Sequence, residues 1–245
     1  MPLEAVLFDL DNTLMDYAGY KLRTAVAAAE EMVSRGFPDT VDNIVKKIFG
    51  IYDNHGMEYQ KTLSAVIVQY GLKMREGEFF QQAALIAYNR EKYTKGIMPY
   101  PGAVEALVEI RAMGLKTAIV TDGPRNKVSQ RLLLARIEHL FSLVVTHDDT
   151  RQHKPHPAPF RCALKKLRAK PHNAMMVGDI VARDVFGAKK LEIITCHAVF
   201  GHRDRIRNEG KGGMVKRMNP EHIVEPDHKI NSFRELPPLA ARLMR

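Results

Sequence analysis

The chain has 245 residues, which is enough for one large domain or for a domain that carries an insertion. Its 45% hydrophobic and 27% charged residues are ordinary for a globular protein, and no apolar run reaches the ~20 residues that span a bilayer. The formal net charge is +9, but no DNA- or RNA-binding motif accompanies it, so we do not expect a nucleic-acid partner. The first residues lack a signal-peptide pattern, and Cys162 and Cys196 are too few for a disulfide framework, which favours a cytoplasmic protein.

The first predicted element is a buried strand that runs into two aspartates. Residues 5–8 are continuously apolar, as in a strand that is covered on both faces of a parallel sheet. Asp9 follows directly, and Asp11 comes two positions later. Carboxylates at such a place lose hydration, which is costly unless a cation or hydrogen-bond donors compensate them. The pattern therefore predicts a partner for these two side chains.

A helical segment comes next. Residues 20–92 show helical signals and no convincing strand, with apolar residues at three- and four-residue spacings. Gly36 is a natural stop for the first helix. This pattern predicts a bundle of about four helices, at 24–35, 41–54, 58–70 and 76–91.

Beyond residue 100, predicted helices alternate with predicted strands, which indicates an α/β fold with a doubly wound parallel sheet. The helices are predicted at 102–114, 125–135, 156–169 and 181–191, and the strands at 116–123, 143–149, 174–179 and 192–199. We therefore predict a core formed by residues 1–14 and 97–245, with the helical segment at 15–96 inserted as a second domain. The Gly-rich basic stretch 201–220 is predicted to be a loop of unassigned role.

Polar residues follow several of these strands, where ligands bind in open α/β sheets. Singly, each has an ordinary explanation: aspartates in loops make local hydrogen bonds, a lysine is often solvated, and carboxylates favour the starts of helices. Together, in this order and all at strand ends, they predict a functional site. Its candidate residues are Asp9, Asp11, Thr121, Asp122, Gly123, Lys154, Asp179 and Asp184.

Four segments resemble the motifs of the haloacid dehalogenase-like (HAD) hydrolase superfamily, most of whose members are phosphatases. They are FDLDNT, VTDG, the lysine of KPHPAPF, and GDIVARD, and the resemblance runs from residue 3 to about 200. It implies a doubly wound core that carries a helical cap domain, inserted just after the first motif.

The resemblance also implies roles for these residues. Asp9 corresponds to the nucleophile, and Asp11 to the residue that acts first as acid and then as base. Mg²⁺ would be held by the carboxylates of Asp9 and Asp179 and the backbone carbonyl of Asp11, with Asp184 behind them. The positions that hold the transferring phosphoryl group correspond to Thr121, Asp122, Gly123 and Lys154.

The expected function is therefore Mg²⁺-dependent hydrolysis of a small phosphorylated metabolite through an aspartyl-phosphate intermediate, by a monomer or a homodimer. Phosphomutases of the superfamily share both aspartates and stay open as an alternative. The 2-haloacid dehalogenases lack the second aspartate and resemble this chain less. A receiver-type signalling domain would be far shorter, and a non-catalytic binding protein of this fold would be expected to have lost a motif residue. Within the insertion, the candidates for substrate contact are Tyr17, Lys47, His55 and Tyr59, although each could equally be a surface or packing residue.

Overall fold

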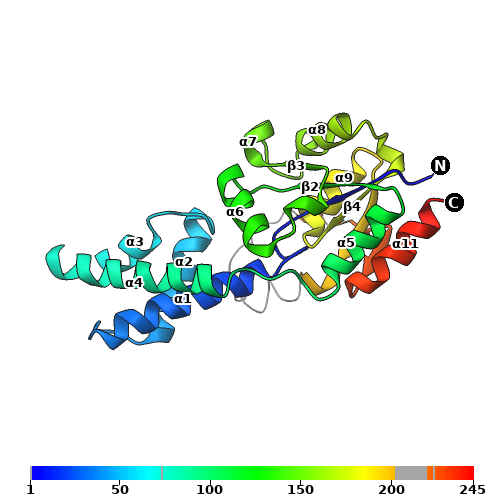
Figure 1. The fold of residues 1–245 in the computed structure, drawn as a ribbon. Coiled ribbons are helices and arrows are strands. Elements are labelled where there is room, and N and C mark those ends of the chain that lie inside the picture. Colours follow the sequence, from blue (N-terminus) through cyan, green and yellow to red (C-terminus); the bar gives the residue numbers. More distant parts are fainter. Residues whose placement is uncertain (1, 73, 202–219, 223) are drawn as a thin grey trace. The chain divides into compact units, whose positions relative to one another are not determined.

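The computed structural model describes residues 2–72, 74–201, 220–222 and 224–245 (Figure 1). These residues fall into two compact units. The second unit comprises 18–72 and 74–96, and the first comprises the remaining described residues. The basic loop predicted at 201–220 lies almost entirely outside the described residues. Within the described part of the chain, no helix is both long and apolar enough to cross a membrane.

The first unit contains a six-stranded parallel sheet with the strand order β3-β2-β1-β4-β5-β6. This is the order of a doubly wound α/β sheet, so the predicted fold class is confirmed. The last strand was not predicted, because its sequence HKI is short and mostly polar. The strands are β1 (Ala5–Phe8), β2 (Lys116–Val120), β3 (Leu143–Val145), β4 (Ala174–Gly178), β5 (Ile194–Ala198) and β6 (His228–Ile230).

Strand β1 lies between β2 and β4, and all four of its residues are buried. Its last residue, Phe8, is in register with Ile119 of β2 and Val177 of β4. Because the three strands are parallel, their carboxyl ends meet at one edge of the sheet. The residues that follow them therefore lie close together in space, although they are far apart in the sequence.

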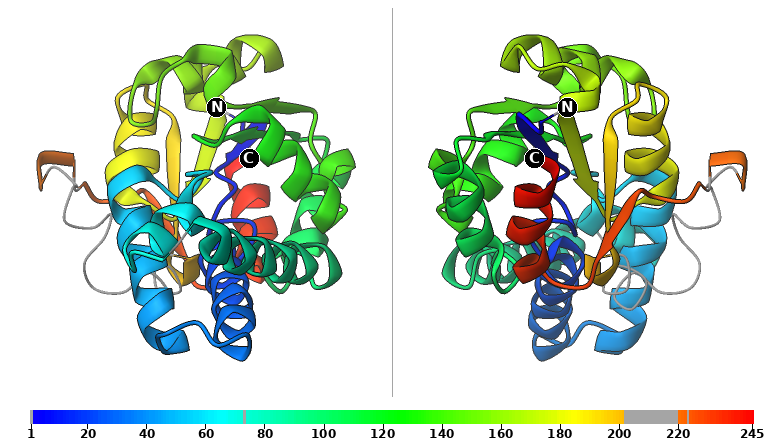
Figure 2. Two further views of the ribbon diagram at one scale, coloured as in Figure 1. Left: turned by 90° about the vertical axis from the view of Figure 1, so that its left-hand side faces the viewer. Right: turned by 90° about the vertical axis from the view of Figure 1, so that its right-hand side faces the viewer.

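Helices cover both faces of this sheet (Figures 1 and 2), as a parallel sheet requires. Ala5 and Leu7 face one side, where they share a core cluster with Phe160 and Leu164 of α8 and with Ala188 of α9. On the other side, α5 and α11 contact each other. The helices of this unit are α5 (Ala103–Ala112), α6 (Arg125–Ala135), α7 (His147–Thr150), α8 (Pro157–Leu167), α9 (Phe186–Lys189) and α11 (Leu236–Leu243).

Two of the predicted elements beside the motif segments differ in the structure. The strand predicted at 143–149 ends at Val145, because Thr146 and Asp149 form a reciprocal capping box that starts the short helix α7. The helix predicted at 181–191 begins with a π-helical turn, Val181–Val185, before α9. This turn follows directly on the Gly178-Asp179 pair and carries Asp184, so it decides where that carboxylate lies.

The second unit is built from four described helices that share one apolar core. Its cluster of buried residues draws on all four and includes Ala28, Ile48, Val66 and Ala84. Phe37, in the connection after the first helix, packs edge-on against the rings of neighbouring aromatic residues. The helices are α1 (Tyr17–Ser34), α2 (Val41–His55), α3 (Thr62–Val68) and α4 (Met74–Thr94).

The two chain segments that lead into and out of the insertion run beside each other. Met15 forms an antiparallel bridge with Pro99, and the Tyr100 amide donates to the Leu14 carbonyl at 2.9 Å. Met15, Asp16 and Tyr17 group with the first unit. The insertion therefore leaves and rejoins the core at one place.

Candidate active site

The first-motif loop turns sharply after β1. The Asp9 amide donates to the Val177 carbonyl of β4 at 2.9 Å, which fixes the aspartate at the sheet edge. Asn12 has a φ of 61°, in the left-handed region that asparagine tolerates better than most residues. The turn brings the buried Thr13 hydroxyl back to donate to Asp9 Oδ2 at 3.2 Å and to Asp179 Oδ1 at 3.4 Å. Thr13, which the sequence prediction did not include, thus joins two of the predicted site residues.

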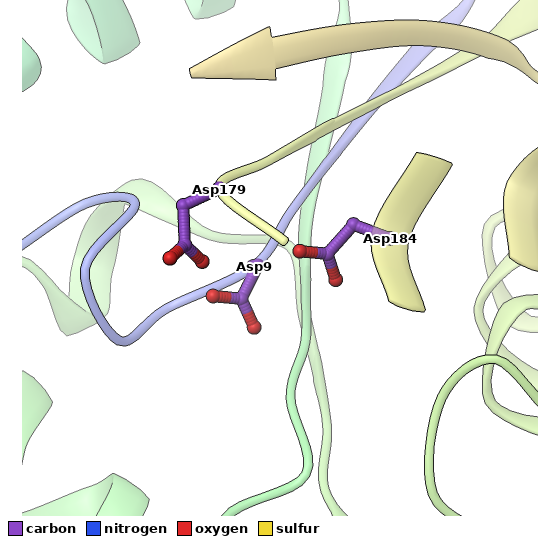
Figure 3. Close-up of side chains that lie close together, drawn as sticks. All are labelled: Asp9, Asp179 and Asp184. Carbon is purple, nitrogen blue, oxygen red and sulfur yellow. The ribbon is translucent and has the colours of Figure 1, made fainter. Parts of the chain in front are cut away.

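Three buried carboxylates converge here. One oxygen each from Asp9, Asp179 and Asp184 lie within 4.8 Å of one another, and the close-up shows the three carboxylates gathered around one place (Figure 3). Burial raises the pKa of Asp9, the charge of Lys154 opposes this rise, and the nearby charges of Asp184 and Asp11 add to it, so that the pKa is about 7. Buried, like-charged oxygens at this spacing suit a hard divalent cation, which would relieve both the burial and the repulsion.

Lys154 is the basic group of this cluster. Its side chain is 2% exposed, and its ammonium lies 2.6 Å from Asp9 Oδ1, 2.6 Å from Asp184 Oδ1 and 2.9 Å from the Val120 carbonyl. Burial alone would lower the pKa of this lysine, but the charges of Asp184 and Asp9 overcome that and raise it above its usual value. Lys154 is therefore a permanently charged counter-ion held against the predicted nucleophile.

The second-motif loop is tied to the same lysine. Thr121 is buried at the end of β2, and its hydroxyl accepts a hydrogen bond from the Gly123 amide at 3.2 Å. The Asp122 carboxylate accepts from the Lys154 amide at 2.8 Å and forms an ion pair with Arg183. Burial opposes ionisation of Asp122, yet these partners and His153 hold its pKa below the usual range. The Asp122 side chain therefore stabilises the loop, and only the Asp122 backbone is left to contact a bound group.

Asp11 lies apart from the three converging carboxylates. Its Oδ2 forms an ion pair with Arg131, a buried residue of α6, and the Tyr17 ring covers the same guanidinium at 4.3 Å. Sequence reasoning missed Arg131. A signal was present, because Arg131 follows Val128 by three positions and precedes Leu132, the spacing of one buried helix face.

The four residues predicted to contact substrate have different surroundings. Tyr17 packs on Arg131 within the first unit. Lys47, on α2, lies 3.9 Å from an Asp39 oxygen and 3.9 Å from the centre of the Tyr70 ring. His55 is the last residue of α2, and its ring stacks on the Tyr59 ring with 4.5 Å between the ring centres. Substrate contact by these side chains stays a prediction.

Several known proteins resemble this chain in sequence. The family model described as haloacid dehalogenase-like hydrolase matches residues 6–198. The chain is 29% identical over 199 residues to the glyceraldehyde 3-phosphate phosphatase of Pyrococcus furiosus, which covers 81% of this chain and 82% of that protein. It is 28% identical over 247 residues to the enzyme of the same name from Methanocaldococcus jannaschii, with 99% of each chain covered.

The fold has close counterparts among solved structures. The crystal structure of a HAD phosphatase from Thermococcus onnurineus superposes with a TM-score of 0.64, covering 97% of each chain at 23% identity. The family match spans the first strand, the helical insertion and the remaining motif strands. With its sheet order and its motif residues in place at one sheet edge, the chain belongs to the haloacid dehalogenase-like hydrolase family.

Proposed function

We propose that this protein is a Mg²⁺-dependent phosphatase that hydrolyses small phosphomonoesters through an aspartyl-phosphate intermediate. The observation that carries the proposal is the convergence of Asp9, Asp179 and Asp184 with the Lys154 ammonium inserted between two of them. Such a site combines a nucleophilic carboxylate, ligands for a cation and a fixed positive charge, which are the parts that phosphoryl transfer requires.

Carboxylates of Asp9 and Asp179 and the Asp11 backbone carbonyl would hold the metal, with Asp184 beside them. When bound, Mg²⁺ neutralises part of the phosphate charge. Thr121, the backbone at 122–123 and Lys154 hold the phosphoryl oxygens. Lys154 also keeps the Asp9 carboxylate in place for attack.

The reaction then proceeds in two steps. In the first, an oxygen of Asp9 attacks phosphorus, the bond to the leaving oxygen breaks, and Asp11 gives that oxygen a proton. In the second, water attacks the acyl-phosphate while Asp11 takes its proton, which releases phosphate and restores Asp9.

The substrate is a small phosphorylated metabolite, and triose phosphates come first because the relatives named above act on glyceraldehyde 3-phosphate. The test is a phosphate-release screen of the purified protein over a panel of metabolites with Mg²⁺, and again with a chelator. We expect turnover of short phosphate esters that stops on chelation, and much lower turnover of phosphorylated proteins. Full activity after exhaustive chelation would refute the metal dependence, and no release from any ester would refute the function.

The same samples separate the alternatives within the family. A phosphomutase would convert a sugar phosphate into its isomer with little free phosphate, which chromatography of the products detects. A dehalogenase would release halide from short 2-haloacids, and we expect none here because Asp11 occupies the position at which that class lacks an aspartate.

A further inference from the structure

Arg131 is a buried cation that lies outside the four motif segments. It projects from α6 on the face that also carries Val128 and Leu132, and its side chain is 6% exposed. Its guanidinium meets Asp11 Oδ2 in an ion pair and lies 4.3 Å from the centre of the Tyr17 ring. Burying a guanidinium is costly without such partners, so this arrangement needs both the carboxylate and the ring.

The second-motif loop also lies beside Arg131, in addition to Asp11 and Tyr17. A Cβ placed on Gly123 would lie 3.4 Å from Arg131 Nη1 and 2.9 Å from a methyl of Val128. Arg131 is therefore packed between the first-motif loop, the second-motif loop and the start of α1. A planar guanidinium that is confined in this way fixes the orientation of the carboxylate it binds.

The two oxygens of Asp11 are unequal as a result. Oδ2 is held by Arg131, whereas Oδ1 is buried and has no hydrogen-bond partner among the residues that the structure describes. A buried acceptor without a partner is costly and requires an explanation, and a catalytic role is one such explanation. Oδ1 is thus the oxygen that Asp11 presents for proton exchange.

We propose that Arg131 is the positioning residue of Asp11: it anchors Oδ2 so that Oδ1 faces the leaving group and then the attacking water. This inference rests on the proposed phosphatase function. In the first step the proton on Oδ1 passes to the leaving alkoxide as its bond to phosphorus breaks. In the second step Oδ1 takes a proton from water. Arg131 keeps its own protons throughout and touches no reacting atom.

The test uses two esters, since only one of them needs the proton. An alkyl phosphate from the screen has a poor leaving group, whereas 4-nitrophenyl phosphate has a good one. For Arg131→Met we expect kcat on the alkyl ester to fall roughly 100-fold, the lower end of what general acid catalysis contributes, with KM little changed. Single-turnover release of 4-nitrophenol with enzyme in excess should stay within about twofold of the wild type, because that step needs no acid.

Three further variants isolate the cause. Arg131→Lys keeps the charge without the planar fork and should lose less than Arg131→Met; it also serves if the Met variant does not fold. Arg125→Met changes an exposed arginine of the same helix and should match the wild type. In the Asp11→Asn background, Arg131→Met should cost nothing more, since the group that it positions no longer transfers a proton.

The outcomes are distinct. Equal losses on both esters, or a further loss in the Asp11→Asn background, would show that Arg131 only supports the fold and would overturn the inference. Those results would leave the phosphatase function standing. A wild-type protein that hydrolyses neither ester would instead overturn the proposed function, and with it the role assigned to Arg131.

Discussion

Lys154 Nζ lies 2.6 Å from Oδ1 of Asp9, although the two residues are 145 positions apart in the sequence. The same ammonium lies 2.6 Å from Oδ1 of Asp184. One buried cation therefore links the first, third and fourth motif segments. This contact therefore bears on stability as well as on the proposed catalysis, since removing the cation would leave two buried carboxylates facing each other.

Lys154→Met should both abolish activity and destabilise the protein. Removing one partner of a buried ion pair costs about 3–5 kcal/mol, because the remaining charge has no compensation. The free energy of unfolding, measured by urea denaturation of the metal-free protein at pH 8, checks this. Lys166→Met is the control, since its exposed ammonium lies 3.4 Å from Asp149 and such pairs contribute at most about 1 kcal/mol. Equal unfolding midpoints for the two variants would contradict the prediction.

Asp9→Asn should remove turnover without loss of stability. An amide is a poor nucleophile, so we expect phosphate release to fall below detection. The pKa of Asp9 is raised from 3.8 to about 7, so the folded protein binds this proton more tightly than the unfolded chain does. Ionisation of Asp9 therefore destabilises the folded protein as the pH rises from about 4 to about 7. The asparagine of the variant does not ionise, so the variant does not lose this stability. Thermal melts of the metal-free proteins across this range should diverge, with the variant the more stable at pH 8. A variant that melts well below the wild type there would show that this explanation is wrong.

Magnesium binding should release a proton near neutral pH. With its pKa at about 7, the Asp9 carboxyl of the metal-free protein is about half protonated at pH 7, and a metal ligand must be ionised. Below that pH the apparent affinity should fall by about tenfold per unit. Calorimetric titrations in two buffers of different ionisation enthalpy measure the proton directly. Asp9→Asn should show no release, and a wild type without release at pH 6.5 would argue against Asp9 as a ligand.

Gly178→Ala should disturb the acidic cluster by displacing Asp184. A Cβ at Gly178 would lie 2.4 Å from Cβ of Asp184, so the π-helical turn that carries this aspartate must shift. We expect a loss of about 1–3 kcal/mol in stability, together with weaker Mg²⁺ binding. Gly50→Ala, in the interior of α2 with nothing within 4 Å, is the matched control and should instead stabilise by about 0.5–1 kcal/mol. Similar effects of the two substitutions would count against the packing argument.

The sheet and the meeting of the motif residues could be predicted from the sequence, since both follow from local pattern and from the geometry of parallel strands. Asp9, Thr121 and Asp179 each follow an apolar run, and parallel strands bring such ends to one edge. The ion pairs of Arg131 and Arg183 could not be predicted in this way. A guanidinium sits at the end of a long side chain, and its partner depends on how neighbouring loops pack in three dimensions. The short helix α7, by contrast, could have been predicted, because Thr146 and Asp149 have capping-box spacing in the sequence.

The central place of β1 bears on how the chain is made. Ala5 leaves the ribosome early, but its partners in the sheet are Lys116 and Ala174, which are synthesised about 110 and 170 residues later. The helices of the insertion depend on local contacts and form fast, whereas the sheet must wait for both neighbours of its first strand. Until then the apolar run Ala5–Phe8 is an unpaired strand, the kind of segment that associates with other chains. We therefore expect the nascent protein to depend on chaperones until β4 has emerged, so slower translation beyond residue 120 should increase aggregation.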